Sequence, residues 1–414
     1  MILARLALRY LLRQRRRTAL TLLVVGAGFV ALNLAGGFMA QTFRGLAEGA
    51  IRGGLGHVQV LPVGAAEGDE AQSLERALPD GEALAARLRQ DPAVAETLPR
   101  IAFMGLLSNG PRSVAFLGRA VDPEREPRHM ATADALRDGA KDPAGAGSRW
   151  LSASPSAREA ILGVGLARAL GARVGDSLTL LSTTREGALN AQDVEVVGLQ
   201  DLGLRELNDR ALTVSLATAA QLLEAGPARS GLAVVLKDPE AAEAQARRLQ
   251  AQLPGVQARP WFEQASFYRQ VKLLYIAIFG FMGLVLFLVV LLATANTLLM
   301  SVLERVRECG VRRAMGLQPS QLVALLQWEG ALLGLLGSAL GLVATLLLRA
   351  GLNALHLQLL PPPGTSHGYE LHIHFVPGVT LAVAAGLQLT LHLSALVPGL
   401  KAARLRVVEA LRHV

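Results

Sequence analysis

The sequence predicts a membrane protein in which four transmembrane α-helices, in a 1+3 arrangement, flank a large mixed α+β extracytoplasmic domain. Its 414 residues are 51% hydrophobic with a mean hydropathy of +0.37, although only 4% are aromatic. Four uncharged runs are long enough to cross the hydrocarbon core of a bilayer, which takes about 20 apolar residues in a helix. A stretch of soluble composition separates the first run from the other three.

These runs divide the chain into nine segments. The predicted segments are a cytoplasmic or interfacial amphipathic helix (1–17), transmembrane helix 1 (18–43), a periplasmic α+β domain (44–271), transmembrane helix 2 (272–303), a cytoplasmic charged region (304–321), transmembrane helix 3 (322–349), a periplasmic loop (350–375), transmembrane helix 4 (376–400) and a cytoplasmic tail (401–414).

The first segment has the pattern of a helix that lies along a membrane surface. Arg5, Arg9 and Arg13 fall on one helical face, with leucines elsewhere. The uncharged run that follows is longer than the apolar part of a signal peptide, and no small-x-small cleavage site follows it. We therefore expect a retained anchor.

The outer domain alternates between short strand and helix patterns. Strands are predicted at "HVQVLPV" from His57, "SVAFLG" from Ser113, "DSLTLLS" from Asp176, "QDVEVVGL" from Gln192 and "LAVVLK" from Leu232. Helices are predicted near Asp80, Gly163, Leu216 and Asp238. The run "RDGAKDPAGAGS" from Arg137 predicts a flexible loop.

Sequence motifs for catalysis are missing from this domain. It has no GxxxxGK[ST] loop for ATP phosphates, no GxSxG, no HExxH and no paired cysteines. The single cysteine, Cys309, forms no disulfide within the chain. We therefore expect a non-catalytic chain whose outer domain makes contacts and is held together by its core alone.

Basic residues lie on one side of the predicted spans. The first 17 residues, Glu304–Glu329 and Leu400–Val414 together carry a net charge of +10, whereas the large domain carries −2. Positive charge is retained on the cytoplasmic side, so both termini are expected there and the large domain outside. This bias also explains the pI of 10.3 without a nucleic-acid partner.

A dense charged patch, "ERVRECGVRRAMG" from Glu304, lies between the second and third runs. Helical spacing places Glu308 four residues before Arg312, an order that favours an ion pair, and Gly316 is placed to end the helix. A loop that only fixes topology is one interpretation. An ordered, short charged helix indicates instead a docking element for a cytoplasmic partner.

The segment "ERVRECGVRRAMGLQPSQLVALLQWEGALLGLLGSALG", the span layout and the closing "LVPGLKAARLRVVEALR" together resemble the FtsX/MacB/LolC-LolE permease family of ABC transporters. The resemblance implies a coupling helix that sits on a separate ABC ATPase subunit. It implies ATP and Mg on that partner and no cofactor in this chain. The implied ATPase-coupling residues are Glu304, Arg305, Arg307, Glu308, Gly310, Arg312, Arg313 and Gly316.

The resemblance also implies mechanotransmission, in which ATP hydrolysis by the partner moves the outer domain. Lipoprotein or lipid extraction is the leading expectation. The alternatives are MacB-like drug or peptide efflux, an FtsX-like regulator of cell-wall hydrolases that transports nothing, and a membrane-anchored binding or metal-sensing module. Implied partners are a second permease copy or paralogue, a periplasmic adaptor or acceptor protein, and membrane lipids.

Several residues within the spans have two interpretations. Glu329 is either an interfacial residue or a hinge. Two G-x-x-x-G spacings allow close helix approach, either within the chain or between subunits; they comprise Gly330, Gly334, Gly337 and Gly341. Polar side chains inside spans are expected to hydrogen-bond between helices; they are Asn33, Asn296, Gln388 and His392.

Four histidines crowd the loop before the fourth span: His356, His367, His372 and His374. The "HIH" pattern would place two imidazoles on one face of a strand, a geometry that can bind zinc or copper. No cysteine or ordered carboxylate accompanies them, so the sequence favours solvent-exposed histidines and no metal site, with His367, His372 and His374 as weak candidates.

Overall fold

The computed structural model describes residues 2–65, 74, 76–131, 135–136, 147–304, 306–359 and 369–404. The chain forms two compact units. The helical unit comprises Met1–Arg44, Val271–Gln358 and Glu370–Val414, and the sheet unit comprises Gly45–Gln270 and Leu359–Tyr369.

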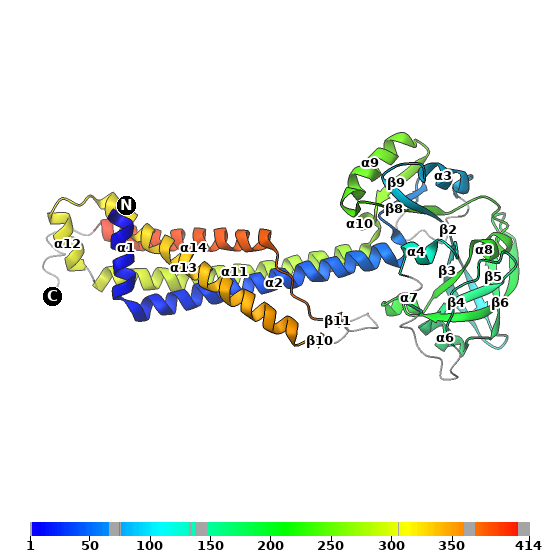
Figure 1. Cartoon of the computed structure of the whole chain (residues 1–414), viewed down its shortest axis with the longest axis horizontal. Coiled ribbons are helices and arrows are strands. Elements are labelled where there is room, and N and C mark those ends of the chain that lie inside the picture. The colour runs from blue at the N-terminus through cyan, green and yellow to red at the C-terminus, as the bar shows by residue number, and fades with distance from the viewer. Residues whose placement is uncertain are drawn as a thin grey trace. The chain divides into compact units, whose positions relative to one another are not determined.

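Long helices make up the helical unit (Figure 1). They are α1 (Ile2–Arg13), α2 (Arg15–Ala50), α11 (Ser266–Glu304), α12 (Val306–Ala314), α13 (Pro319–Ala354) and α14 (Pro377–Ala403). Among the described residues, four helices are long and apolar enough to cross a membrane, namely α2, α11, α13 and α14. This confirms the prediction of four helices with membrane-spanning length and composition.

Glycines let α13 approach α14 closely. A Cβ atom built on Gly330 would lie 3.1 Å from the carbonyl oxygen of Leu391, and one on Gly334 would lie 2.9 Å from Cδ1 of Leu391. Both glycines are buried. The first G-x-x-x-G spacing therefore packs against α14, within the chain.

The second spacing packs α13 against a different helix. A Cβ atom on Gly337 would lie 2.6 Å from Cγ1 of Val25, and one on Gly341 would lie 2.8 Å from Cβ of Phe29. Both contacts are with α2. The first two glycines of α13 thus contact α14 and the next two contact α2, so α13 packs closely against both helices.

Hydrogen bonds between helices satisfy some of the polar side chains within the spans. Thr380 Oγ1 donates to Asn33 Oδ1 at 2.8 Å and joins α14 to α2. The Gln327 Oε1 atom of α13 lies 2.7 Å from His392 Nδ1 of α14. Gln388 differs from the expectation, because its Nε2 atom lies 3.2 Å from His392 Nε2 within the same helix. Asn296 differs, because its side chain is exposed on α11.

The described strands of the sheet unit form one nine-stranded sheet. They are β1 (Val58–Pro62), β2 (Val94–Ser108), β3 (Ser113–Val121), β4 (Glu159–Gly163), β5 (Ser177–Thr183), β6 (Leu189–Gln200), β7 (Ala211–Ser215), β8 (Gly231–Leu236) and β9 (Val256–Pro260). Their order is β3-β7-β4-β6-β5-β2-β8-β1-β9, with a further pairing between β3 and β2.

The strand order divides the sheet into two parts that share β2. The second half of β2, from Ile101, pairs with both β3 and β5, so β2, β3, β7, β4, β6 and β5 close into a barrel. The first half, as far as Arg100, pairs with β8 and completes an antiparallel sheet with β1 and β9. With α3 (Gly81–Leu88) and α9 (Ala242–Gln252), this second part has the βαββαβ order of a ferredoxin-like fold.

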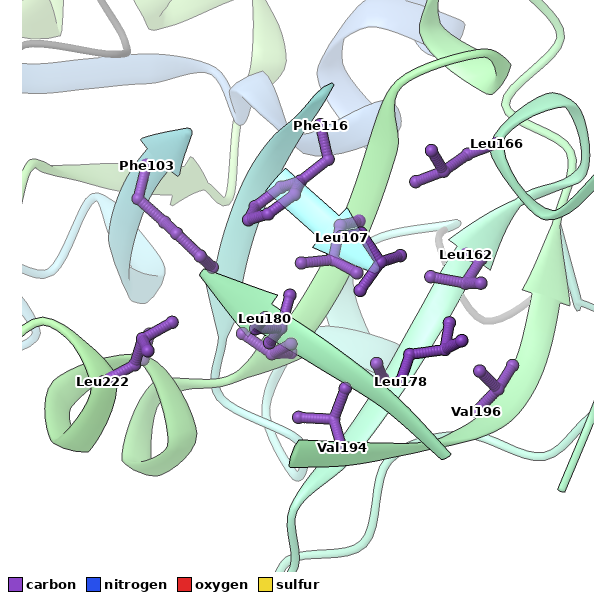
Figure 2. Packing of buried hydrophobic residues seen from close by; sticks show 14 of the residues in the cluster. Phe103, Leu107, Phe116, Leu162, Leu166, Leu178, Leu180, Val194, Val196 and Leu222 are labelled. Atoms are coloured by element: carbon purple, nitrogen blue, oxygen red, sulfur yellow. The ribbon is translucent and has the colours of Figure 1, made fainter. Parts of the chain in front are cut away.

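Each part has its own hydrophobic core. The barrel core contains Leu107, Phe116 and Leu180, closed by Leu166 of α6 (Val164–Leu170) and Leu222 of α8 (Leu216–Leu222) (Figure 2). The ferredoxin-like part packs valines of β1 and β8 against Ala85 of α3 and Leu249 of α9. No disulfide is available to either core, because the chain has a single cysteine.

Among the nine strands of this sheet, the five predicted strands are present, but the other four have no clear signal in the sequence. The missed strands are β2, β4, β7 and β9. Strand β2 carries Pro99 and two charged residues, and β4 and β7 are short and buried along most of their length, so period-2 alternation is lost. Most of the predicted loop from Arg137, residues 137–146, lies outside the described residues.

Candidate coupling site

Helix α12 lies between α11 and α13 in the chain and has a defined C-terminal end (Figure 1). It is followed by Gly316, whose φ of 98° is a left-handed conformation that glycine adopts without steric cost. The N–H of Leu317 donates to the carbonyl of Arg312 at 3.0 Å and closes the turn. Pro319 then begins α13, where Gln318 and Gln321 form a capping box.

Both glutamates of the charged patch are held by arginines near the N-terminus. Arg17 Nη1 donates to Glu304 Oε2 at 2.8 Å, and its second guanidinium nitrogen also pairs with this carboxylate. Arg13 Nη1 lies 3.6 Å from Glu308 Oε1. Two arginines four residues apart thus face two glutamates four residues apart.

The arginines at the end of α12 also make contacts within the chain. The guanidinium carbon of Arg312 lies 5.1 Å from the centre of the Tyr10 ring, within the range of a cation-π interaction. Arg313 Nη1 donates to the carbonyl of Ala403 at the end of α14, at 3.3 Å. The expected ion pair between Glu308 and Arg312 is therefore wrong: among the described residues, Glu308 pairs with Arg13 of α1.

The exposed face of α12 is different from the one that charge alone predicts. Arg307 is exposed, and so are two apolar side chains, Val311 at 42% and Met315, the residue directly after the helix, at 75%. Gly310 is buried. Arg305 and the side chain of Cys309 lie outside the part of the chain that the structure describes.

Glu329 is not at the edge of the bundle. Its side chain is 3% exposed, and with Tyr10 and Arg312 it lines a cavity of about 20 Å³ beneath α12. The surrounding core includes Val302 of α11 and Leu322 of α13. Residues of α1, α11, α12 and α13 therefore meet at this cavity, and Glu329 belongs to that junction.

Sequence reasoning missed the role of α1 in this site. Tyr10, Gln14 and Arg17 carry no motif, and the arginines of this region were accounted for by membrane topology. The matched spacing of Arg13 and Arg17 with Glu304 and Glu308 is a signal that could have found the two ion pairs. Ala403 contributes only a backbone carbonyl, which no sequence pattern reveals.

The histidines before α14 are partly brought together. The rings of His372 and His374 lie 5.0 Å apart in an edge-to-face arrangement, but residues 371–376 are not a strand, contrary to expectation. Burial, and then the neighbouring His372, lower the pKa of His374. His356 Nδ1 instead pairs with Glu370 Oε1 at 2.6 Å, and His367 is not among the described residues.

A metal-binding arrangement is not present in the described part of the chain. No group of three or more His, Cys, Asp or Glu side chains there is placed to hold a metal ion. Two imidazoles alone fall short of the usual ligand set for zinc.

Comparison with known families covers most of the chain. Residues 18–252 match the family described as MacB-like periplasmic core domain, and residues 280–407 match the FtsX-like permease C-terminal family. The chain belongs to this MacB-like and FtsX-like permease family. Helix α12 lies inside the FtsX-like region, and all of the barrel lies inside the MacB-like region.

Curated members of the family include transmembrane proteins of lipoprotein-releasing systems. The chain is similar to LolC of Neisseria meningitidis serogroup B, with 29% identity over 60% of this chain and 60% of that protein. It is also similar to LolC of Xylella fastidiosa, with 26% identity over 78% of this chain and 79% of that protein. The periplasmic region of MacB from Actinobacillus actinomycetemcomitans is 15% identical and covers 51% of this chain and 92% of its own length, with a TM-score of 0.36.

Proposed function

We propose that this chain is the membrane subunit of an ABC transporter. A separate ATPase subunit binds ATP and Mg and drives the transporter. The membrane subunit releases a lipoprotein or another lipophilic substrate from the outer face of the inner membrane. The names of the curated relatives support the substrate class. The observation that carries the proposal is α12, an ordered helix held by ion pairs and with one face left exposed.

The exposed face of α12 suits a protein partner better than it suits water. Val311 and Met315 are apolar, and Arg307 supplies a charge at the start of the same face. Methionine adapts to irregular surfaces, and arginine and methionine are both enriched at protein interfaces. We assign the ATPase contact to this face, and we assign Glu304, Glu308, Arg312 and Arg313 to holding the helix in place.

Movement of the ATPase would reach the sheet unit through covalent connections. Helices α2 and α11 each begin in one unit and end in the other. Since Arg17 of α2 holds Glu304 of α11, both helices are attached to the base of α12. A displacement of α12 would therefore act on both at once. The cytoplasmic position of α12 and of the termini, and the periplasmic position of the sheet unit, rest on the charge bias.

The test uses the full chain co-expressed with a candidate ABC ATPase subunit from the same organism. Arg307→Glu and Met315→Asp are expected to reduce co-purification and ATPase turnover at least tenfold, the effect expected of a desolvated contact residue. Arg247→Glu is the matched control, because Arg247 is also exposed but lies on α9 in the sheet unit. Lipoprotein release from proteoliposomes to a soluble acceptor would fall in parallel. Unchanged assembly and turnover in both α12 variants would overturn the ATPase contact, and no ATP-dependent release by the wild-type complex would overturn the substrate class.

A second candidate function is efflux of a drug or peptide with a periplasmic adaptor. The match of residues 18–252 to the MacB-like core domain favours it. The release assay separates the two, because an efflux subunit would stimulate export of a small molecule from the same vesicles and leave the lipoprotein in the membrane.

A further inference from the structure

One face of α1 is exposed among the described residues. Ala7, Tyr10 and Leu11 are buried against neighbouring helices. The opposite face exposes Leu8 at 43% and Leu12 at 60%. Arg5 and Arg9 are exposed on the same face at helical spacing, and Arg15 and Arg16 are exposed at the start of α2.

The charge around this face has one sign. Six arginines fall in the first 17 residues, and the first acidic residue of the chain is Glu48. Arg13 and Arg17 are paired with Glu308 and Glu304. Arg5 and Arg9 are exposed on the same face as Leu8 and Leu12, a combination of apolar and cationic groups that suits an anionic surface with an apolar layer beneath it.

The position of α1 brings this face to such a surface. Only Gln14 separates α1 from α2, the first helix of membrane-spanning length. Thr18 Oγ1 donates to the carbonyl of Leu11 at 2.9 Å and fixes the bend between them. Figure 1 shows α1 lying across the direction of α2. A helix that turns across the end of a spanning helix runs along the membrane surface.

We infer that the exposed face of α1 is a binding site for anionic phospholipid headgroups. The guanidinium groups of Arg5 and Arg9 pair with lipid phosphates, and Leu8 and Leu12 insert below them. An exposed arginine near an anionic leaflet contributes roughly a fivefold increase in binding. A protein partner is the competing occupant of this face. Such a partner would bury Arg5 and Arg9, whereas Glu308 and Glu304 are already paired with Arg13 and Arg17.

The same helix touches the coupling site, so lipid binding has a consequence there. Tyr10 contacts Arg312 and Arg13 pairs with Glu308, both from the side of α1 that faces α12. Headgroups that hold α1 at the membrane surface therefore also fix α12. This consequence rests on the proposed function, whereas the lipid site itself does not.

The first experiment measures lipid selectivity of the full chain without an ATPase. The chain is reconstituted in phosphatidylcholine membranes with trace spin-labelled phosphatidylglycerol or phosphatidylcholine, and the motionally restricted lipid fraction is recorded. We expect phosphatidylglycerol to be preferred, and we expect Arg5→Gln/Arg9→Gln to lower that preference at least fivefold. Arg87→Gln/Arg247→Gln changes the net charge equally in the sheet unit and should leave the preference unchanged. Equal selectivity in the wild type and the Arg5→Gln/Arg9→Gln variant would overturn the proposal.

The second experiment places a spin label at position 12 through Leu12→Cys in a Cys309→Ser background. In phosphatidylglycerol-containing membranes the label should be more accessible to oxygen than to a water-soluble nickel complex, and Arg5→Gln/Arg9→Gln should shift it toward water. Protection that arises only on adding the ATPase would overturn the lipid assignment and give this face to the protein partner. Failure of either lipid experiment leaves the ATPase contact of α12 intact, because neither uses turnover as a readout.

Discussion

Arg17 and Glu304, 287 residues apart in the sequence, form a two-pronged ion pair that joins the start of α2 to the end of α11. The Nη1 to Oε2 distance is 2.8 Å. Gln14 extends the contact, because Ser301 Oγ donates to Gln14 Oε1 at 3.3 Å. Both charged side chains are partly exposed, so the pair contributes less than about 1 kcal/mol to stability. Its importance lies in its place, directly before α12.

Reversing one charge of this pair should separate the two helix ends, and reversing both should restore them. Arg17→Glu and Glu304→Arg each place like charges in contact, whereas the double variant rebuilds the pair. The measurement is disulfide formation between Gln14→Cys and Ser301→Cys in a Cys309→Ser background. We expect cross-linking to fall severalfold in each single variant and to recover in the double variant. Equal cross-linking in all of these proteins would show that the ion pair does not hold the ends together.

Enlarging Gly337 should disturb the contact between α13 and α2. A Cβ atom there would lie 2.6 Å from Cγ1 of Val25, too close for two carbons. Overpacking of this kind costs about 1–3 kcal/mol. Gly337→Ala should therefore lower the thermal stability of the purified chain, and Val25→Ala should restore part of it by removing Cγ1.

The control for Gly337→Ala is Gly386→Ala on α14, where a Cβ atom would meet nothing within 4 Å. It should not lower stability, since alanine favours the helix by about 1 kcal/mol. If Gly337→Ala proved as stable as Gly386→Ala, the close approach of α13 to α2 would be incorrect.

Local patterns predicted the local features of the fold. Uncharged runs located the four long helices, and Gly316 marked the end of α12, because each of these signals is local. The closed barrel could not be predicted, since it depends on β2 pairing with β3, β5 and β8 across long separations. The candidate coupling site also depends on contacts between residues far apart in the sequence. The charge pattern predicted a helix at α12, but tertiary packing determines that Arg312 faces Tyr10 while Arg307 is exposed.

Breaking the buried ion pair between Arg100 and Glu126 should destabilise the sheet unit strongly. Arg100 Nη1 lies 2.7 Å from Glu126 Oε2, and Glu126 is fully buried. Arg100 is the last residue of β2 to pair with β8, and Ile101 is the first to pair with β3, so the pair sits where the two parts of the sheet meet. Glu126→Ala leaves a buried charge without its partner, which costs about 3–5 kcal/mol.

Hydrogen exchange of the β2 amides in the full chain measures this cost as a loss of protection. Arg100→Met/Glu126→Leu removes both charges and should recover most of the protection, because a buried pair is often replaceable by apolar groups. Arg149→Ala is the comparison: its Nη2 atom is 2.8 Å from Glu159 Oε1, but its side chain is half-exposed, so its loss should cost about 1 kcal/mol or less. A similar loss in Glu126→Ala and Arg149→Ala would contradict the role given to burial.

Acidification should loosen the start of β1 through His57. This side chain is 8% exposed, and its Nδ1 atom accepts a hydrogen bond from the N–H of Leu236 at 3.0 Å. The backbone of the same residue accepts from the N–H of Trp261 at 3.0 Å, so His57 joins β1, β8 and α10 (Trp261–Gln264). An Nδ1 atom that accepts a hydrogen bond carries no proton, and burial lowers the pKa of His57 below its ordinary value of 6.5.

The sign of the pH effect follows from that direction. Between 6.5 and the lower pKa of the folded state, the unfolded chain binds a proton that the folded chain does not, so the free energy of unfolding decreases as pH falls. The stabilisation by His57 is fully present above pH 6.5 and is lost at a rate of up to about 1.4 kcal/mol per pH unit as the pH falls below that value.

His57→Asn keeps a hydrogen-bond acceptor near Leu236 but cannot be protonated, so its stability should change less than that of the wild type between about pH 7.5 and about pH 5.5. His57→Ala should be less stable at both pH values, because the Leu236 N–H is left without an acceptor at a cost of about 1–3 kcal/mol. Hydrogen exchange of β1 and β8 in the full chain measures both effects, and an identical pH dependence in the wild type and His57→Asn would exclude His57 as their source.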